Sequence, residues 1–270
     1  MGEHFCLKCG GGGHPKPAFR IREAMEPKHI STSQSGYRNR ILARISASES
    51  RELLAQAEPI DLPLGKVLRE PASADKFLYF LEEGMASATA LSSAGASVEV
   101  GLIGREGFVG ISSVLGHPGS PHHTIMQVAG RGFSLPTGSF RAEFLRGGPM
   151  AHAVHDFIYA QLAQAAQTAL CNRLHATEPR LARWLLMTSD IVEADTLQLT
   201  QEFLAQMIGA ERSTATIAAG ALKRAGLIDY HRGLVTIINR PMLEDAACEC
   251  YSLLRAQFRA IFGADRASVG

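Results

Sequence analysis

Residues 199–240 read LTQEFLAQMIGAERSTATIAAGALKRAGLIDYHRGLVTIINR, and this stretch decides the fold. Apolar side chains recur at helical spacing on both sides of Gly209, at Leu204, Ala205, Ile208, Ala210, Ala215 and Ala218. Ala205 is small where two helices would approach closely, and Gly209 suits the left-handed conformation in which many helices end. The pattern predicts two short helices joined by a tight turn, the helix-turn-helix whose second helix lies in a DNA major groove.

A predicted β-hairpin follows the two helices. The second helix ends at Ala225-Gly226, and residues 227–230 and 234–238, which we interpret as strands, then flank the turn His231-Arg232-Gly233. This order is typical of the wing of a winged helix. Since a helix-glycine-helix pattern alone occurs in many helical hairpins, the hairpin strengthens the prediction. The alternative is a small α/β subdomain that does not contact DNA.

The composition bounds the function. A chain of 270 residues that is 46% hydrophobic can form about two domains with cores of their own. The formal net charge of +1 gives the whole chain no preference for polyanions, so DNA binding requires a local basic patch. The candidate patch contains Arg212, Lys223, Arg224, His231 and Arg232. Three acidic residues in the same stretch, Glu202, Glu211 and Asp229, reduce its net charge. We therefore expect moderate affinity per subunit, raised by dimerisation.

The sequence predicts a cytoplasmic protein. It contains no run of about 18 apolar residues, which a membrane span needs. Its start, MGEHFCLKCGGGGHP, lacks the apolar region of a secretory signal. The five cysteines are irregularly spaced and do not suggest a disulfide framework.

Residues 1–36 are rich in Gly, Pro, Ser, His and Lys, and we interpret them as a flexible tail. Cys6, Cys9 and His14 resemble half of a metal site. A closed zinc or iron–sulfur site needs four ligands, and only three are local. Both interpretations, tail and partial metal or redox site, stay open.

Short apolar strands separated by glycine turns fill the next hundred residues and predict an antiparallel barrel or roll. From Met150 to Glu178 there is no Gly or Pro. Apolar residues with 4-3-4 spacing form a narrow seam on this long predicted helix, at Ile158, Leu162, Ala165 and Ala169. Such a seam is typical of a helix that pairs with its own copy. The alternative is a helix buried within one chain.

Two further helical patterns flank the helix-turn-helix. Glu178-Pro179-Arg180 is expected to break the long helix, and a third helical element around Trp184 follows, with Trp184 in the core. A last helix is expected over residues 242–262. Cys248 and Cys250 would then point about 200° apart on one helix and be poor partners for one metal ion. We therefore interpret them, like Cys171, as core or surface thiols and predict no metal site and no cofactor.

In chain order, a roll, a long helix and a winged helix resemble the Crp/Fnr family of bacterial transcription regulators. The resemblance covers roughly residues 37–240 and is sharpest at 199–209 and 225–238. Residues 104–116, GREGFVGISSVLG, are similar to the roll segment that reads Gly-Asp-x-Phe-Gly-Glu in nucleotide-binding members. The run Cys-Glu-Cys-Tyr at 248–251 is similar to a branch found in soil bacteria.

The resemblance implies an α+β fold with an antiparallel β-roll of the jelly-roll type (a double-stranded β-helix), a long dimerisation helix and a C-terminal winged helix-turn-helix. The corresponding domains would be the tail over 1–36, a cyclic-nucleotide-binding-like sensor roll over 37–148, the dimerisation helix over 149–177, and the DNA-binding domain with a C-terminal helix over 178–270.

Departures from the family pattern argue against its usual effectors. In members that bind cyclic AMP, a glutamate holds the ribose and an arginine holds the phosphate. Ile111 stands at the glutamate position, and Pro121-His122-His123-Thr124 stands near the arginine position. Because a buried phosphate needs a charge-assisted partner, we predict no ordinary cyclic AMP binding. Oxygen-sensing members carry an N-terminal cysteine cluster and a roll cysteine, which this chain does not match. Haem ligation by His117, His122 or His123 has no supporting context.

The resemblance also assigns DNA contacts. Arg212 matches a family arginine that can hold guanine O6 and N7. Family readers that are often Glu and Arg are here Ser213 and Ile217, so the operator should differ. The further candidates would contact phosphates or thymine methyl groups, and they are Thr200, Gln201, Thr214, Thr216 and Arg232.

The resulting hypothesis is a homodimeric transcription regulator whose partners are double-stranded DNA, its own copy and, if it activates, RNA polymerase. The alternative is a small-molecule sensor whose winged helix binds a partner protein. The steep salt dependence of true DNA binding distinguishes the two. We expect no enzyme, because the sequence has no Gly-rich phosphate loop, H-E-x-x-H motif or nucleophile elbow, and no paired carboxylates in a roll pocket.

Overall fold

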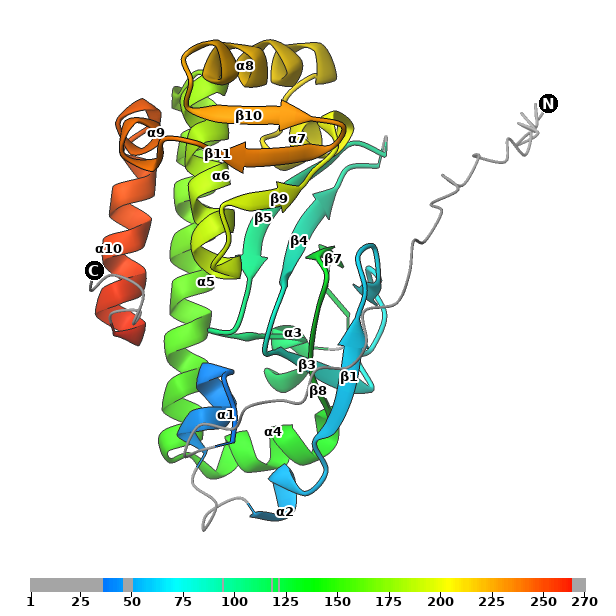
Figure 1. Ribbon diagram of the computed structural model, residues 1–270. Helices are drawn as coiled ribbons and strands as arrows, with labels where there is room; N and C mark the ends of the chain where they lie inside the picture. The colour runs from blue at the N-terminus through cyan, green and yellow to red at the C-terminus, as the bar shows by residue number, and fades with distance from the viewer. Residues whose placement is uncertain (1–35, 46–50, 94, 118, 121, 264–270) are drawn as a thin grey trace, which may run out of the picture. The chain divides into compact units, whose positions relative to one another are not determined.

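The computed structural model describes residues 36–45, 51–93, 95–117, 119–120 and 122–263, and these all belong to one unit (Figure 1). Residues 1–35 of the expected tail over 1–36, with Cys6, Cys9 and His14, lie outside the described residues, so both interpretations of the tail remain predictions.

The amino-terminal half is an antiparallel roll built from two four-stranded sheets. The first sheet has the order β1 (Glu58–Leu62), β8 (Gly130–Pro136), β3 (Phe77–Leu81) and β6 (Phe108–Val109). The second has the order β2 (Val67–Arg69), β7 (His122–Val128), β4 (Met85–Leu91) and β5 (Ser97–Ile103). Both sheets pair strands that are distant in sequence, as a jelly roll does. The predicted roll is confirmed.

Phenylalanine rings join this roll to its helices, which are α1 (Arg40–Arg44), α2 (Arg51–Leu54), α3 (Ile111–Val114), α4 (Thr137–Arg146) and α5 (Pro149–Leu174). The ring of Phe108 from β6 lies 5.4 Å from that of Phe140 in α4 and 5.5 Å from that of Phe157 in α5. A Cβ on Gly107 would lie 1.9 Å from the Phe157 ring. Glycine at this position therefore lets α5 pack directly against the strand.

The long helix ends earlier than expected. It stops at Leu174, and α6 (Thr177–Val192) begins before the predicted break. Pro179 lies in the first turn of α6, where a missing backbone N–H leaves no helical bond unmade. The expectation that Glu178-Pro179-Arg180 separates two helices is thus wrong in position, because this proline starts a helix rather than ending one.

The carboxy-terminal half contains the predicted winged helix. Helices α7 (Gln201–Met207) and α8 (Arg212–Arg224) flank the turn, and a three-stranded sheet has the order β10 (Ile228–His231), β11 (Leu234–Ile237) and β9 (Thr196–Gln198). Gly209 has a φ of +58°, the left-handed conformation expected of it. Trp184 is fully buried, as predicted.

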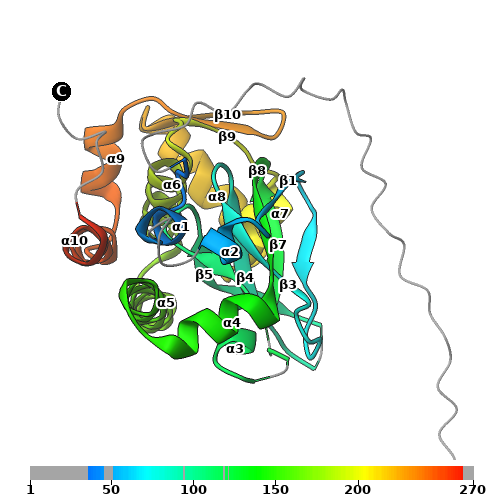
Figure 2. The same ribbon diagram turned by 90° about the horizontal axis from the view of Figure 1, so that it is seen from below.

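The predicted last helix is two helices, α9 (Arg240–Ala246) and α10 (Cys250–Phe262), separated by residues 247–249. Helix α10 folds back along α5, and the two lie side by side in both views (Figures 1 and 2). This return places residues near 250 beside the end of α5.

Candidate nucleic-acid interface

Helix α8 has one buried face and one exposed face. Small and apolar side chains pack it against α6 and α7, namely Ala215, Ala218, Ala219 and Leu222. On the opposite face Ser213 and Arg224 are exposed, and the side chain of Ile217 is 69% exposed. This face of α8 is therefore open to contact with another molecule.

Arg212 lies at the start of this face, in the first turn of α8, and is exposed. Ser213 and Thr214 beside it are also exposed. Thr216 is half-buried, and its hydroxyl donates to the carbonyl of Arg212 at 2.8 Å. The structure thus brings together the candidates of α8 at one helix end, with the Thr216 hydroxyl already bonded to its own helix.

Thr200 caps α7 as expected. Its Oγ1 accepts a hydrogen bond from the backbone N–H of Phe203 at 3.2 Å, which satisfies one of the open donors of the first turn. Gln201 begins α7, but its side chain lies outside the described residues. Leu199 donates its N–H to the carbonyl of Gly233 at 2.7 Å, so the start of the motif and the wing turn are held together.

The basic patch is smaller than the sequence suggests. Lys223 contacts Asp229 at 2.7 Å and the carbonyl of Tyr230 at 3.0 Å, and this lysine holds the pKa of Asp229 below its usual value. Among the described residues, Arg212, Arg224 and Arg232 remain exposed without an ion-pair partner. Arg232 occupies the wing turn with a φ of +48°.

Helix α7 rests on the roll through Met207. Its sulfur lies 2.6 Å from the side-chain amide of Gln127 in β7 and 3.7 Å from the hydroxyl of Ser87 in β4. The helix-turn-helix therefore touches the second sheet of the roll directly.

A buried glutamate forms a second contact between the roll and the winged helix. Glu99 of β5 accepts from Trp184 Nε1 at 2.9 Å and from Ser87 Oγ at 2.8 Å. Burial raises the pKa of Glu99 to about 7, against the lowering effect of its bonds to Ser87 and Trp184 and of the charge of Arg183. Sequence reasoning missed this residue, although a glutamate between Val98 and Val100 in an apolar strand was a signal.

An ion pair of buried side chains lies beside β7 in the roll. The side chains of Arg69 and Asp75 are both buried, with Nη2 of Arg69 3.0 Å from Oδ2 of Asp75, and Ser113 donates to Asp75 at 2.6 Å. Burial, together with the charge of Arg69, lowers the pKa of half-buried His122, so its neutral form is favoured. Ile111 is half-buried at the start of α3. The one buried arginine of this group is thus already paired.

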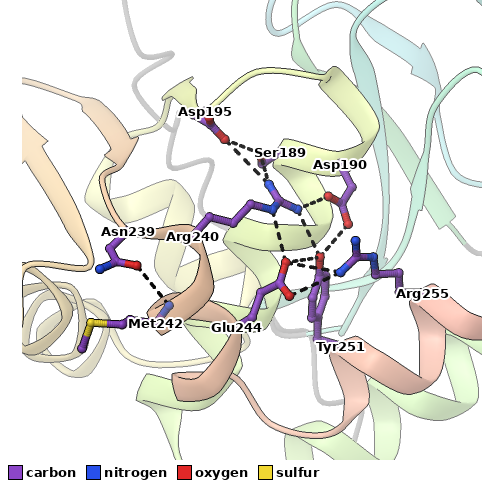
Figure 3. A network of polar contacts seen from close by, with 9 residues as sticks. All are labelled: Ser189, Asp190, Asp195, Asn239, Arg240, Met242, Glu244, Tyr251 and Arg255. Atoms are coloured by element: carbon purple, nitrogen blue, oxygen red, sulfur yellow. Dashed lines mark hydrogen bonds and ion pairs between the residues drawn. The ribbon is translucent and has the colours of Figure 1, made fainter. Parts of the chain in front are cut away.

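Arg240 anchors the C-terminal helices and was also missed (Figure 3). At the start of α9 it bonds Asp190 and, at 3.0 Å, Ser189, both from α6. It also reaches Glu244 at 3.2 Å and the Tyr251 hydroxyl at 3.1 Å. A single guanidinium with its fixed fork of donors therefore connects α6, α9 and α10.

The structure corrects the interpretation of the cysteines. Cys248 precedes α10 and Cys250 is its first residue, so they do not lie on one helix and their thiols do not diverge. They meet Cys171 and His175 from the end of α5, and the four potential ligand atoms all lie within 4.8 Å of one another. A hydrogen bond from Cys248 is the largest cause that lowers the pKa of Cys171 to about 5.

The class of this domain follows from three elements: helix α7 with its N-terminal cap, helix α8 with its exposed face, and the hairpin β10–β11. Together they form a winged helix-turn-helix DNA-binding domain. Residues 179–246 match the family model of the Crp-like helix-turn-helix domain. No curated protein matches the chain.

Solved structures extend the likeness to the whole fold. FixK2 from Bradyrhizobium japonicum is 14% identical with a TM-score of 0.61, over 71% of this chain and 98% of that one. The regulator CLP from Xanthomonas campestris, described as c-di-GMP responsive, is 17% identical with a TM-score of 0.59, and the match covers 71% of this chain and 99% of CLP. TTHA1359 from Thermus thermophilus, a Crp/Fnr-family transcriptional regulator, is 21% identical with a TM-score of 0.59, and the match covers 70% of this chain and 98% of TTHA1359.

The chain thus carries a Crp-like DNA-binding domain within the fold of the Crp/Fnr transcription regulators, and the resemblance indicated by its sequence is confirmed. Within the part of the chain that the structure describes, no helix is long and apolar enough to cross a membrane.

Proposed function

We propose that the protein is a sequence-specific transcription regulator that binds a two-fold symmetric DNA operator as a homodimer. The observation that carries this proposal is the exposed face of α8 within a domain that matches the Crp-like model. In a dimer, two such helices about 34 Å apart would enter successive major grooves. Such a regulator works in the bacterial cytoplasm without enzymatic activity, and RNA polymerase is a further partner if it activates transcription.

The candidate contacts divide into base readers and phosphate holders. The guanidinium of Arg212 can bond guanine O6 and N7 together, and the Ile217 side chain can pack on a thymine methyl group. The hydroxyls of Ser213 and Thr214 and the charge of Arg232 suit phosphate oxygens, which fix register without reading sequence.

DNA titration and footprinting test this assignment. Arg212→Ala should weaken binding by about 1–3 kcal/mol at each half-site and relax the preference at one base pair. Arg259→Ala is the matched control, because it removes an exposed arginine from α10 and should leave affinity unchanged. Wild-type affinity should fall steeply with salt. An Arg212→Ala variant with unaltered affinity and base preference would remove the role assigned to this residue.

The exposed apolar side of α5 supports dimerisation. Leu162 is 68% exposed, Ala169 is also exposed, and Ile158 and Ala165 are half-buried. A row of this kind is suited to the same helix of a second copy.

Light scattering on the purified chain tests the dimer. Leu162→Glu should shift the mass from two chains toward one, because two carboxylates would meet inside the seam. Leu145→Glu on α4, where the leucine is 63% exposed, is the control and should stay dimeric. A monomeric wild-type chain would contradict the proposal.

The paired charges in the roll support independence from cyclic AMP. A cyclic phosphate would have to displace Asp75 from Arg69, or rely on His122, whose lowered pKa favours the neutral ring. Calorimetry with cyclic AMP should detect no binding. Saturable binding that strengthens DNA affinity would overturn this part of the proposal.

A further inference from the structure

The cluster Cys171, His175, Cys248 and Cys250 combines side chains from three places in the fold. Cys171 and His175 are one helical turn apart at the end of α5, Cys248 lies between α9 and α10, and Cys250 begins α10. The Sγ atoms of Cys171 and Cys248 are 3.5 Å apart, and the Sγ of Cys250 lies 3.4 Å from Nδ1 of His175.

We propose that these four residues bind one zinc ion in a tetrahedral Cys₃His site. Zinc–sulfur bonds of about 2.3 Å at a tetrahedral angle place two thiolates about 3.8 Å apart. The mutual spacing of the four ligand atoms, within 4.8 Å, matches a single ion. A polynuclear iron–sulfur cluster inserts its own atoms between the ligands and would hold the thiolates farther apart.

The surroundings of the four residues fit ligands of a metal. Nε2 of His175 lies 3.1 Å from a carboxylate oxygen of Glu249, an arrangement that orients the ring and leaves Nδ1 toward the cysteines. Zinc-bound histidines almost always have such a partner on the other nitrogen. The amide of Gln167 donates to Cys250 Sγ at 3.0 Å, as expected for a sulfur that carries negative charge.

Charge balance gives an independent reason. Arg180 and Arg183 are 7% and 3% exposed, and the Nε of each has no hydrogen-bond partner. The side-chain bonds that they make go to the Gly209 carbonyl at 3.4 Å and the Met187 sulfur at 3.4 Å, neither of which is an anion. Buried cations require a compensating charge. The carboxyl of Glu99 is close enough to Arg183 to interact with its charge and supplies part of this compensation. Three thiolates around one Zn²⁺ carry a net charge of −1 and would supply the rest beside Arg180 and Arg183.

The site would fix the position of the C-terminal helices. The site joins the end of α5 to the start of α10. The buried Arg180 beside the site also donates to the carbonyl of Gly209, in the turn between α7 and α8. A bond network of this kind has a structural role, since four protein ligands leave no open position for substrate.

Metal analysis of the full chain, purified without added chelator, tests the proposal. We expect about one zinc per chain in the wild type, and the same in a Cys6→Ser/Cys9→Ser variant, which removes the tail cysteines. Cys248→Ser should lose most of the zinc, and cobalt substitution of the wild type should give the visible bands of a tetrahedral thiolate site.

A second variant distinguishes the loss of a zinc ligand from misfolding of the Cys248→Ser protein. His175→Cys replaces one ligand by another, so it should keep about one metal ion and shift the cobalt spectrum. The proposal fails if the wild type contains no zinc, or if zinc is lost from the Cys6→Ser/Cys9→Ser variant but kept in Cys248→Ser. It also fails if the chain carries an iron–sulfur chromophore, or if mass spectrometry finds a disulfide between Cys171 and Cys248.

Discussion

Glu99 should make the stability of the protein depend on pH, and the sign follows from its environment. Burial raises the pKa of this carboxyl from its usual 4.5 to about 7. Between these values the folded chain holds a proton that the unfolded chain releases. Stability from this group is therefore full below about pH 4.5 and is lost as the pH rises toward 7.

The magnitude follows from the same pKa change. At about 1.4 kcal/mol for each tenfold change in proton affinity, the rise corresponds to about 3 kcal/mol of unfolding free energy above pH 7. Glu99→Gln removes this cost, because the amide is neutral at every pH and its carbonyl can still accept from Trp184 Nε1. The variant should match the wild type near pH 4.5 and exceed its stability by up to about 3 kcal/mol at pH 8.

Urea unfolding of both proteins at several pH values measures the effect. The difference between the two proteins isolates Glu99 from the other titrating groups, and Glu58→Gln, at an exposed position of β1, is the control that should not change the pH profile. A Glu99→Gln variant that is less stable than the wild type by the same amount at pH 5 and pH 8 would refute the reasoning, because the carboxylate would then be ionised and favourably paired.

Three further changes test the architecture. Thr200→Ala should lower the unfolding free energy by about 1 kcal/mol in urea titrations, because α7 loses its N-terminal cap, whereas Thr200→Ser should not. Gly107→Ala should cost more, about 2–3 kcal/mol or loss of folding, since its methyl group would overlap the Phe157 ring; a thermal melt equal to that of the wild type would contradict this packing. Arg240→Ala should increase amide exchange in α9 and α10 but not in the roll, because the guanidinium that ties both helices to Asp190 of α6 is removed.

The features that sequence could predict depend on local patterns. The turn at Gly209 and the Thr200 cap involve residues within a few positions of one another, so the spacing reveals them. The strands of the roll follow from short apolar runs between glycine turns, even though their pairing joins distant residues such as Ile60 and Gly132.

The missed features depend on contacts across the chain. Glu99 and Trp184 are 85 positions apart, and Cys171 and Cys248 are 77 positions apart. Treating residues 242–262 as one helix placed Cys248 and Cys250 on opposite sides, and only the break before α10 brings them together. The predicted end of the long helix is wrong because it treats Pro179 as a helix breaker, whereas a proline in the first turn favours a helix start.

The contact made by Met207 has a consequence for movement. Methionine has an unbranched side chain with three rotatable bonds, so it can keep touching Gln127 and Ser87 while the two surfaces slide by a small distance. A stiffer branched residue at this position would hold one orientation or lose contact altogether. The thioether thus lets helices α7 and α8 change their orientation on the roll by a small amount while Met207 stays in contact. Such a movement would not require the roll or the winged helix to unfold.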